Sequence, residues 1–448
     1  MLKRILIGFI AFIVIIFLVA AYTAFPIVSG YSAKNLCSHV FLSGRDAQDV
    51  IDKELGNMPL AIGSPKIDLE DQSASATVFG FAKKKAIYRP GLGCTLINSV
   101  EEEDLRVQSF TPPVFPYGKD TLAWPVGDVV ADSLINPAVE RAIAKSFEEP
   151  LPEVPRYTRG VVVVHKGQLI AEQYAPGYDM NTPQLSWSMA KSFTNALIGL
   201  LVKEGRLDIY QRAPIDAWAD PEDPRNQITI DHLLRMSSGL DWSENYALPS
   251  GATNMLFKDA SMAATAASVD LAYPPDSVWY YSSGTTNIIS EIVRNAVGEQ
   301  TYWAFPYKAL FHKIGISTAT WEPDASGTFV GSSYLWMSPR DYARFGQLFL
   351  QDGIWEGKRI LPEGWVTYSS APTPASPQGI YGAQFWRNGY DSFRYPDLPD
   401  DAYLANGYEG QRIMIVPSED LVVVRLGYTA TDDFDMNGLV RDVIAALD

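Results

Sequence analysis

The sequence has few residues of the kinds that build metal sites and disulfide-rich scaffolds. It contains four histidines and two cysteines among 448 residues. The histidines are scattered without the spacing of a metal site, which favours a structural role for each: His39, His165, His232 and His312. A Gly-rich phosphate loop and a Gly-x-Ser-x-Gly turn are also missing, which argues against a nucleotide site and against an α/β-hydrolase. We therefore expect no bound metal ion.

Positive charge is also in short supply. Lys and Arg together number 36 against 52 Asp and Glu, so the formal net charge is −16. Nucleic-acid binding requires basic patches, and this balance argues against it. No run of like charge is long enough to suggest a disordered tail, and internal repeats and low-complexity tracts are absent. The composition, 47% apolar and 20% charged, is that of a globular protein with room for two or three domains.

A long apolar run does occur near the N-terminus. Residues 1–4 end in two basic side chains, and residues 5–25 carry no charge. This run can cross the ~30 Å hydrocarbon core of a bilayer, and it exceeds the core of a signal peptide, which is about 7–15 residues long. Positive charge before the run predicts a cytoplasmic N-terminal tip and export of everything that follows. We expect an uncleaved transmembrane signal anchor; a signal peptide cleaved near Ala21 or Ala24 is the alternative.

The two cysteines agree with export. Cys37 and Cys94 both lie in the first hundred residues, and in an oxidising compartment a lone pair of cysteines is expected to form a disulfide. Closing a loop of this length would stabilise the fold by about 4 kcal/mol in the chain-entropy model. The alternative is two unrelated buried thiols.

Residues 26–110 are expected to form a small accessory α+β domain. Residues 46–55 predict a short helix, and residues 74–80 and 85–89 predict a β-hairpin whose turn lies near a run of three lysines. Nothing in this part indicates catalysis. The Pro-rich residues 111–154 predict a linker or an extended segment.

Residues 155–448 predict an α/β layer that is interrupted by helices. Strands are indicated near both ends of this part, at residues 160–164, 169–174, 404–405, 412–416 and 421–426. Residues from about 207 to 330 are mainly helix and loop, and residues 439–447 predict a closing helix. The predicted sheet is therefore split in the sequence around a helical insertion.

The segment Ser188-Met189-Ala190-Lys191 is the only Ser-x-x-Lys in the sequence. Apolar residues recur after it with helical spacing, and Gly205 is a plausible stop. Residues three apart share one face of a helix, so Lys191 is expected one turn from Ser188. A hydroxyl becomes a good nucleophile when a base takes its proton, and a lysine that burial keeps neutral can serve. The pattern is short, and an exposed serine beside a solvated lysine is the alternative.

Two further segments carry candidate chemistry. The first, residues 279–287, holds Tyr281 before a Ser-Ser-Gly turn; a phenol can relay protons, although simple aromatic packing is the alternative. The second, residues 406–411, has glycines that would let a substrate approach the backbone of an edge strand. That backbone could lend an N–H group to an oxyanion hole.

These three segments, in this order, resemble the serine β-lactamase and penicillin-binding-protein superfamily. The closest match is its class C-like branch, which includes esterases, D-amino-acid peptidases and aminohexanoate-dimer hydrolases. The resemblance covers about residues 155–448 and includes three more segments: residues 228–240, 338–346 and 357–362. It implies a mixed α/β (α+β) fold, an antiparallel sheet flanked by helices plus an all-helical insertion. With the apolar run at residues 5–25, we expect a catalytic domain in the periplasm, anchored in a bacterial inner membrane; a secreted or periplasmic protein after signal cleavage is the alternative.

The resemblance further implies a role for each motif residue. Ser188 would attack a carbonyl and become acylated, Lys191 would take its proton, and Tyr281 would pass a proton to the leaving group. The backbone N–H groups of Ser188 and Gln411 would form the oxyanion hole. Three more side chains or backbone positions would contact the substrate: Ser283, Tyr408 and Gly410. Water would release the acyl group, and no cofactor would be required.

Two departures from the β-lactamase pattern matter for the substrate. Ser283 stands where β-lactamases usually carry asparagine, a feature shared with the aminohexanoate-dimer hydrolases. The third motif reads Tyr408-Glu409-Gly410 in place of Lys-Thr-Gly, so the cation that helps bind a penicillin carboxylate is missing, although Arg412 could compensate. Both departures argue against efficient β-lactam hydrolysis and leave the acylation residues intact.

The sequence therefore predicts a membrane-anchored serine hydrolase that cleaves an amide or ester in a small molecule or short peptide. A D,D-peptidase or β-lactamase acting on peptidoglycan-type substrates is one alternative. A non-catalytic binding protein with the same fold is another, because fold alone does not determine function. The oligomeric state is left open.

Overall fold

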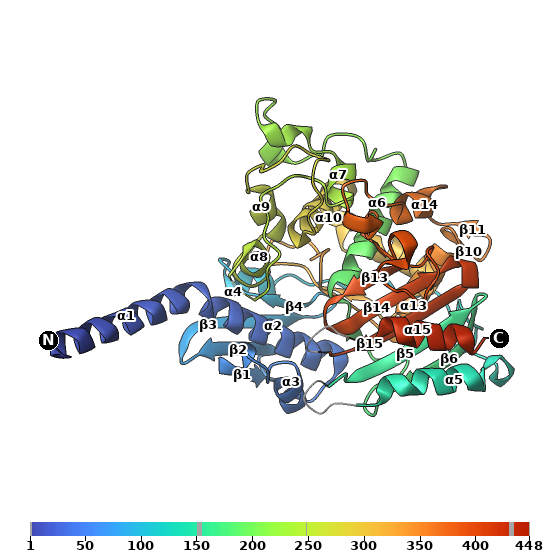
Figure 1. Ribbon diagram of the computed structural model, residues 1–448, viewed down its shortest axis with the longest axis horizontal. Coiled ribbons are helices and arrows are strands. Elements are labelled where there is room, and N and C mark those ends of the chain that lie inside the picture. Colours follow the sequence, from blue (N-terminus) through green and yellow to red (C-terminus); the bar gives the residue numbers. More distant parts are fainter. Residues whose placement is uncertain (1, 150–154, 248, 430–433, 448) are drawn as a thin grey trace. The chain divides into compact units, whose positions relative to one another are not determined.

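The computed structural model describes residues 2–149, 155–247, 249–429 and 434–447 (Figure 1). The chain forms two compact units, each built from three segments. Unit 1 consists of Met1–Thr111, Trp242–Ala266 and Glu322–Thr328, and unit 2 consists of Pro112–Asp241, Ala267–Trp321 and Phe329–Asp448. Two short segments that the sequence places within residues 155–448 therefore belong to the N-terminal unit.

Unit 2 is built on a six-stranded antiparallel sheet. In sheet order its strands are β12 (Trp386–Arg387), β13 (Tyr403–Gly407), β14 (Gln411–Val416), β15 (Leu421–Gly427), β5 (Thr158–His165) and β6 (Gln168–Tyr174). The hairpin of β5 and β6 pairs with the last strand, with Val163 opposite Val423. This sheet confirms the predicted antiparallel arrangement, which is split in the sequence around a largely helical region.

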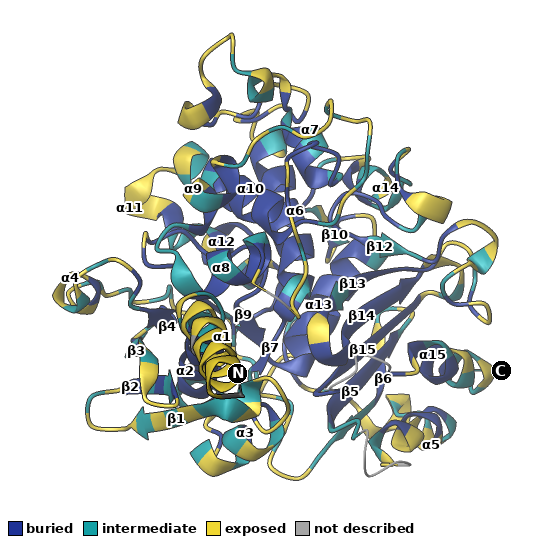
Figure 2. Ribbon diagram, turned by 60° about the vertical axis from the view of Figure 1, so that its left-hand side comes forward, coloured by how far each residue is buried: buried dark blue, intermediate teal, exposed yellow. Residues whose placement is uncertain are grey.

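Helices cover both faces of this sheet. Successive side chains on a strand point to opposite faces. On one face, Val163 and Val423 share a core with α5 (Pro137–Ala144) and α15 (Met436–Ala445). The other face contacts α13 (Pro339–Leu350), where Gly346 lies so close that an added Cβ would meet Val422 Cγ1 at 2.6 Å. Burial on both faces explains why β5 and β15 are nearly continuous valine runs (Figure 2).

The sequence predicts a linker or extended chain for residues 111–154, and here the structure differs. Helix α5 lies in this segment, and the Asn136 side chain caps it by accepting a hydrogen bond from the Ala138 N–H at 2.9 Å. Its buried residues Val139 and Ile143 join the core of the main sheet. The helix has only 8 residues, so its apolar stripe is too short to stand out among the surrounding prolines.

The helical part of unit 2 surrounds α6 (Ala190–Lys203), which contacts α10 (Ser283–Val297). Helix α7 (Ile230–Leu234) begins with a capping box in which Thr229 and His232 bond each other's backbone N–H groups, so His232 has the predicted structural role. The remaining elements of unit 2 are α11 (Glu299–Tyr302), α12 (Phe305–Ala309), α14 (Trp365–Ser370), β7 (Gln184–Leu185), β8 (Thr320–Trp321), β9 (Leu335–Met337), β10 (Ile354–Trp355) and β11 (Lys358–Arg359).

Unit 1 is a four-stranded antiparallel sheet covered by a helix. The strands, in order, are β1 (Gly63–Asp68), β2 (Ser73–Val78), β3 (Phe81–Arg89) and β4 (Gly93–Leu96). Helix α2 (Phe25–Ser43) packs against all four. The other helices are α1 (Leu2–Thr23), α3 (Ala47–Lys53), α4 (Glu102–Arg106), α8 (Gly251–Lys258) and, at the edge of this unit, α9 (Met262–Ala267). The predicted hairpin is confirmed as β2 and β3, with its turn at Phe79 and Gly80.

Helices α1 and α2 follow each other with a break at Ala24. Within the described residues, Lys3–Ser43 is the one stretch long and apolar enough to cross a membrane by length and composition. The first half of this stretch, α1, is exposed (Figure 2), whereas the second half, α2, is largely buried inside unit 1. The sequence does not predict α2 because small polar residues such as Ser29 and Ser32 are buried together with Leu36, which removes the usual amphipathic pattern.

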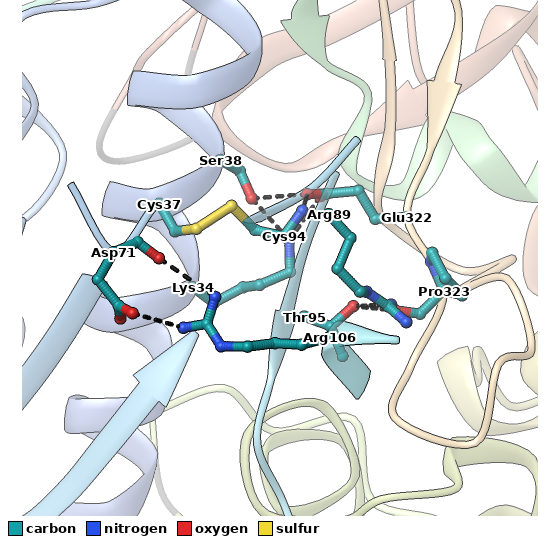
Figure 3. The surroundings of a disulfide bond; sticks show 10 residues. All are labelled: Lys34, Cys37, Ser38, Asp71, Arg89, Cys94, Thr95, Arg106, Glu322 and Pro323. Carbon is teal, nitrogen blue, oxygen red and sulfur yellow. Dashed lines mark hydrogen bonds and ion pairs between the residues drawn. A yellow bond between two sulfur atoms is a disulfide. The ribbon is translucent and has the colours of Figure 1, made fainter. Parts of the chain in front are cut away.

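The predicted disulfide joins Cys37 on α2 to Cys94 on β4 (Figure 3). Beside it lies the buried carboxylate of Glu322, which accepts hydrogen bonds from Lys34 Nζ at 2.5 Å, Ser38 Oγ at 2.8 Å and the Cys94 N–H at 2.6 Å. Burial lowers the pKa of Lys34, and the charge of Glu322 opposes that shift. These bonds explain why the short segment that begins at Glu322 belongs to unit 1.

Candidate active site

Ser188 lies where a single 3₁₀ turn, Trp187–Met189, runs into α6. Both residues beside it are buried, whereas Ser188 itself is half-buried. Helix α6 confirms the helix predicted from the apolar spacing, and Gly205 lies just beyond it with φ +67°. A serine at this position lies at the positive end of the α6 dipole. The next two N–H groups already have acceptors in the preceding turn, since Met189 donates to the Ser186 carbonyl and Ala190 to the Trp187 carbonyl.

Lys191 is buried one turn further along, with 1% of its surface exposed. Its Nζ lies 3.1 Å from Ser188 Oγ, 3.0 Å from Ser283 Oγ and 3.1 Å from the backbone oxygen of Ser332. As an ammonium, Lys191 would donate to all three oxygens. As a neutral amine it would donate to two of them, and its lone pair would face the Ser188 hydroxyl. The geometry therefore suits proton transfer between Ser188 and Lys191.

The predicted second segment lies against this lysine. Tyr281 is half-buried, and Lys191 Nζ lies 4.9 Å from the centre of its ring. The ring also packs against Trp386 at a centroid distance of 5.2 Å. Ser282 caps α10 by accepting a hydrogen bond from the Thr285 N–H at 3.0 Å. The cap and the aromatic packing together hold Tyr281 next to Lys191.

Ser283 has a different environment from the one predicted. The family resemblance implies that Ser283 binds substrate, but its side chain is fully buried and accepts a hydrogen bond from Lys191. The physical reason is its place as the first residue of α10, directly after the capping Ser282, where the helix packs against α6. In this structure Ser283 therefore positions Lys191.

The third segment forms a tight turn between β13 and β14. The N–H of Gln411, predicted as an oxyanion-hole donor, donates to the Tyr408 carbonyl. An oxyanion would have to compete with that carbonyl for the same proton. Gly410 has φ +83°, and an added Cβ would meet Arg425 Nη1 at 2.3 Å, so the turn requires glycine there. Tyr408 remains 46% exposed and is the part of this segment that is open to a ligand.

Arg412 does not act as a replacement for the missing cation in this structure. Its side chain is buried, and Nη1 donates to the backbone oxygens of Gln411, at 2.9 Å, and Gly407. The guanidinium therefore stabilises the turn between β13 and β14 by hydrogen bonds to its backbone. This placement argues against the compensation that the sequence allowed.

Trp187 and Glu409 also belong to the site, with a structural role that the sequence does not predict. Both are buried non-glycine residues with left-handed backbone, at φ +44° and +62°. The Trp187 indole Nε1 donates to Glu409 Oε2 at 2.8 Å, which ties the turn before Ser188 to the third segment. Such backbone strain concentrates at functional sites. Glycine or asparagine would normally mark a left-handed position, so the sequence carries no signal for either residue.

Within the described part of the chain, no three His, Cys, Asp or Glu side chains gather as a metal-binding group. The groups in contact at the site are hydroxyls, an amine, a phenol ring and backbone carbonyls. This set can perform nucleophilic attack and proton transfer on a carbonyl compound.

Comparisons with known proteins agree with this geometry. A family model described as Beta-lactamase matches residues 148–445. A 6-aminohexanoate-dimer hydrolase of Paenarthrobacter ureafaciens is 24% identical over 326 residues, which are 65% of this chain and 79% of that protein.

Two solved structures share the fold. One, from Bacillus anthracis and provisionally assigned as a 6-aminohexanoate-dimer hydrolase, has a TM-score of 0.56 and 23% identity, covering 76% of this chain and 87% of its own. The other, a penicillin-binding-protein homologue from Caulobacter crescentus, has a TM-score of 0.54 and 15% identity, covering 71% and 98%.

Proposed function

The chain belongs to the Beta-lactamase family, and from this premise we propose that it is a serine hydrolase that cleaves an amide or ester through an acyl-enzyme on Ser188. The observation that carries the proposal is the contact between Ser188 Oγ and the buried Lys191 Nζ at 3.1 Å. The position of Ser188 at the start of α6 adds to it, since it keeps the hydroxyl accessible.

In the proposed reaction, Ser188 Oγ bonds to the substrate carbonyl carbon while its proton moves to Lys191 Nζ. The oxygen of the tetrahedral intermediate would be stabilised by the backbone N–H of Ser188, at the positive end of the α6 dipole. The bond to the leaving amine or alcohol then breaks, and that group takes the proton from Lys191, relayed through Tyr281. Water attacks the acyl carbon, its proton passes to Lys191, and the Ser188 hydroxyl is restored as the acid leaves.

The proposed substrate is a short linear amide or ester. The relative from Paenarthrobacter ureafaciens is named for the dimer of 6-aminohexanoate, whose scissile bond is an amide. In β-lactamases, the corresponding turn helps to bind a substrate carboxylate. In this chain the turn carries Glu409, whose carboxylate accepts a hydrogen bond from the Trp187 indole. A substrate whose binding depends on a carboxylate at that position is disfavoured by charge.

We also propose that α1 anchors the enzyme in a bacterial inner membrane, with both units on the periplasmic side. The apolar exposed surface of α1 supports an anchor, and the basic residues before it support a cytoplasmic N-terminus. The disulfide between Cys37 and Cys94 suits an oxidising compartment. Intact-mass analysis of the membrane fraction tests this assignment: the full chain mass is expected, and a mass lacking residues 1–21 or 1–24 would contradict it.

The test of the catalytic proposal is turnover by the full chain in nanodiscs. Nitrophenyl esters, the linear 6-aminohexanoate dimer and a penicillin are offered separately to the wild type, to Ser188→Ala and to Ser38→Ala. Ser38 is the matched control, since it is also a serine beside a buried lysine. We expect the ester or the amide to be hydrolysed by the wild type and Ser38→Ala only. Equal turnover by Ser188→Ala would contradict the proposal, and fast penicillin hydrolysis would contradict the substrate class.

A further inference from the structure

An aromatic cluster lies in unit 1 where α1 meets α2. The ring centroid of Phe17 on α1 lies 5.5 Å from that of Phe25 on α2 and 5.7 Å from that of Phe81 on β3. The ring centroids of Phe25 and Phe79 are 5.8 Å apart. The turn between β2 and β3 therefore packs against the last third of α1. Despite these contacts Phe79 is 62% exposed and Phe81 is 54% exposed.

More apolar surface lies at the same end of this sheet. Gly63 at the start of β1 pairs with Val78 at the end of β2, so the residues just before β1 lie beside the turn. Leu60 and Ile62 pack against the core cluster that contains Phe25 and Val78. Met58, shortly before them, is exposed. This end of unit 1 thus presents large apolar side chains next to a helix that is itself apolar and exposed (Figure 2).

The length of α1 determines the depth of the turn in a bilayer. Phe17 precedes Phe25 by eight residues, which is about 12 Å along a helix axis. If residues 5–25 cross the ~30 Å hydrocarbon core, Phe17 lies about 12 Å inside its outer edge, and a tilt of about 20° changes this little. Because Phe81 contacts Phe17, the turn cannot stay in water while α1 spans the bilayer.

The chemistry of the turn matches a lipid interface. Phenylalanine is typical of the apolar face of segments that lie in the membrane interface, and tyrosine is enriched where the bilayer meets water. Tyr22, near the end of α1, is exposed as well. Lys83 follows the turn on β3 and is exposed, so its charge can face anionic headgroups. The next two lysines have polar partners in unit 1, since Lys84 donates to Asn98 and Lys85 to Glu102.

We propose that the turn Phe79–Phe81 inserts into the outer leaflet beside α1 and, with Met58, docks unit 1 on the membrane surface. The occupant of this apolar surface is the lipid bilayer. The proposal rests on the proposed anchoring by α1 and is independent of the chemistry at Ser188. It predicts that unit 1 has one fixed face toward the membrane instead of turning freely on a flexible stalk.

The test measures depth with spin labels on the full chain in nanodiscs of zwitterionic and anionic phospholipid. Single cysteines are introduced as Phe79→Cys, Phe81→Cys, Ile10→Cys and Val107→Cys; the native cysteines are paired with each other. Ile10 marks the bilayer core, and Val107, which is 79% exposed in unit 1, marks water. We expect oxygen to relax the labels at 79 and 81 more strongly than a water-soluble nickel chelate does, with depth values between the two markers.

Three results would overturn the proposal. Labels at 79 and 81 that behave like the one at 107, with the label at 10 in the bilayer, would show a turn in water. A label at 10 that is also in water would remove the anchor on which the proposal depends. Labels at 79 and 81 shielded from both reagents would show a protein partner in place of lipid. Ester hydrolysis measured on the same samples reports on Ser188 separately, so its loss would leave the membrane contact standing.

Discussion

Each unit of this protein holds a buried lysine beside a serine one helical turn away. In unit 1, Lys34 Nζ lies 2.8 Å from Ser38 Oγ. In unit 2, Lys191 Nζ lies 3.1 Å from Ser188 Oγ. The exposed fractions of the lysines, 3% and 1%, are nearly equal. Burial and a serine neighbour therefore do not distinguish a structural lysine from a catalytic one.

The difference lies in the other partners. Lys34 and Ser38 both donate to the carboxylate of Glu322, which opposes loss of the lysine proton and occupies the serine hydroxyl. Lys191 contacts the Ser283 hydroxyl and the Ser332 carbonyl, which are neutral. These two neutral groups orient the amine through hydrogen bonds. The carboxylate makes the first pair a structural clamp, whereas the proposed function assigns proton transfer to the second pair.

The largest effect is expected for Lys191→Met. The substitution keeps much of the buried volume and removes the group that exchanges the Ser188 proton, so kcat for ester hydrolysis should fall by about 10³-fold or more. The melting temperature should change little. Steady-state kinetics measures kcat, and thermal unfolding of the same preparation measures the melting temperature. A variant that keeps a tenth of the wild-type kcat would contradict the role of Lys191.

Lys34→Met should have the opposite profile. It leaves the Glu322 carboxylate buried without its ammonium, which costs about 3–5 kcal/mol in the free energy of unfolding, while the folded enzyme keeps its kcat. Chemical denaturation in detergent measures the loss. Lys34→Met combined with Glu322→Gln should be less destabilised than Lys34→Met alone, because the unpaired charge is gone. An unchanged free energy of unfolding in Lys34→Met would contradict the structural role of Lys34 and Glu322.

Ser283→Ala separates positioning from substrate binding. Losing one hydrogen bond to the Lys191 amine should lower kcat by about 10–100-fold, with KM nearly constant, and Ser283→Thr should retain most of the activity. Measuring kcat and KM for the wild type, Ser283→Ala and Ser283→Thr distinguishes positioning of Lys191 from substrate binding. A rise in KM at constant kcat would restore the substrate-binding role that the sequence suggested.

The smallest effect is expected for Trp187→Phe. The ring remains, but the hydrogen bond from Nε1 to Glu409 is lost, so the turn before Ser188 is less firmly held. We expect kcat/KM to fall about threefold, a fraction of a kcal/mol. Glu409→Gln, which keeps an acceptor for the indole, is the control and should lose less. An increase in kcat/KM in Trp187→Phe would indicate that the strained turn opposes catalysis.

Much of the fold and of the site was predictable from local patterns. The valine runs of β5 and β15 predicted buried strands, and the spacing after Ser188 predicted α6. The disulfide followed from the presence of only two cysteines. These features depend on residue type and periodicity, which the sequence states directly.

The rest depends on contacts between distant segments. Glu322 pairs with Lys34 across 288 positions, so no local pattern indicates that its segment belongs to unit 1. Helix α2 lacks an amphipathic stripe because it is buried on several sides. The left-handed backbone of Trp187 and Glu409 is imposed by the fold around the site, and neither residue type favours it. The sequence predicted Ser188 and Lys191 as candidate catalytic residues, but it could not predict which groups position their side chains.

Fluorophosphonate labelling of the full chain tests the central claim most directly. Intact-mass and peptide-mass analysis would be run side by side on the wild type, Ser188→Ala and Ser38→Ala. We expect one adduct per chain, located on Ser188, present in Ser38→Ala and absent from Ser188→Ala. An adduct that persists in Ser188→Ala, or one located on Ser38, would contradict the assignment of the two lysine and serine pairs.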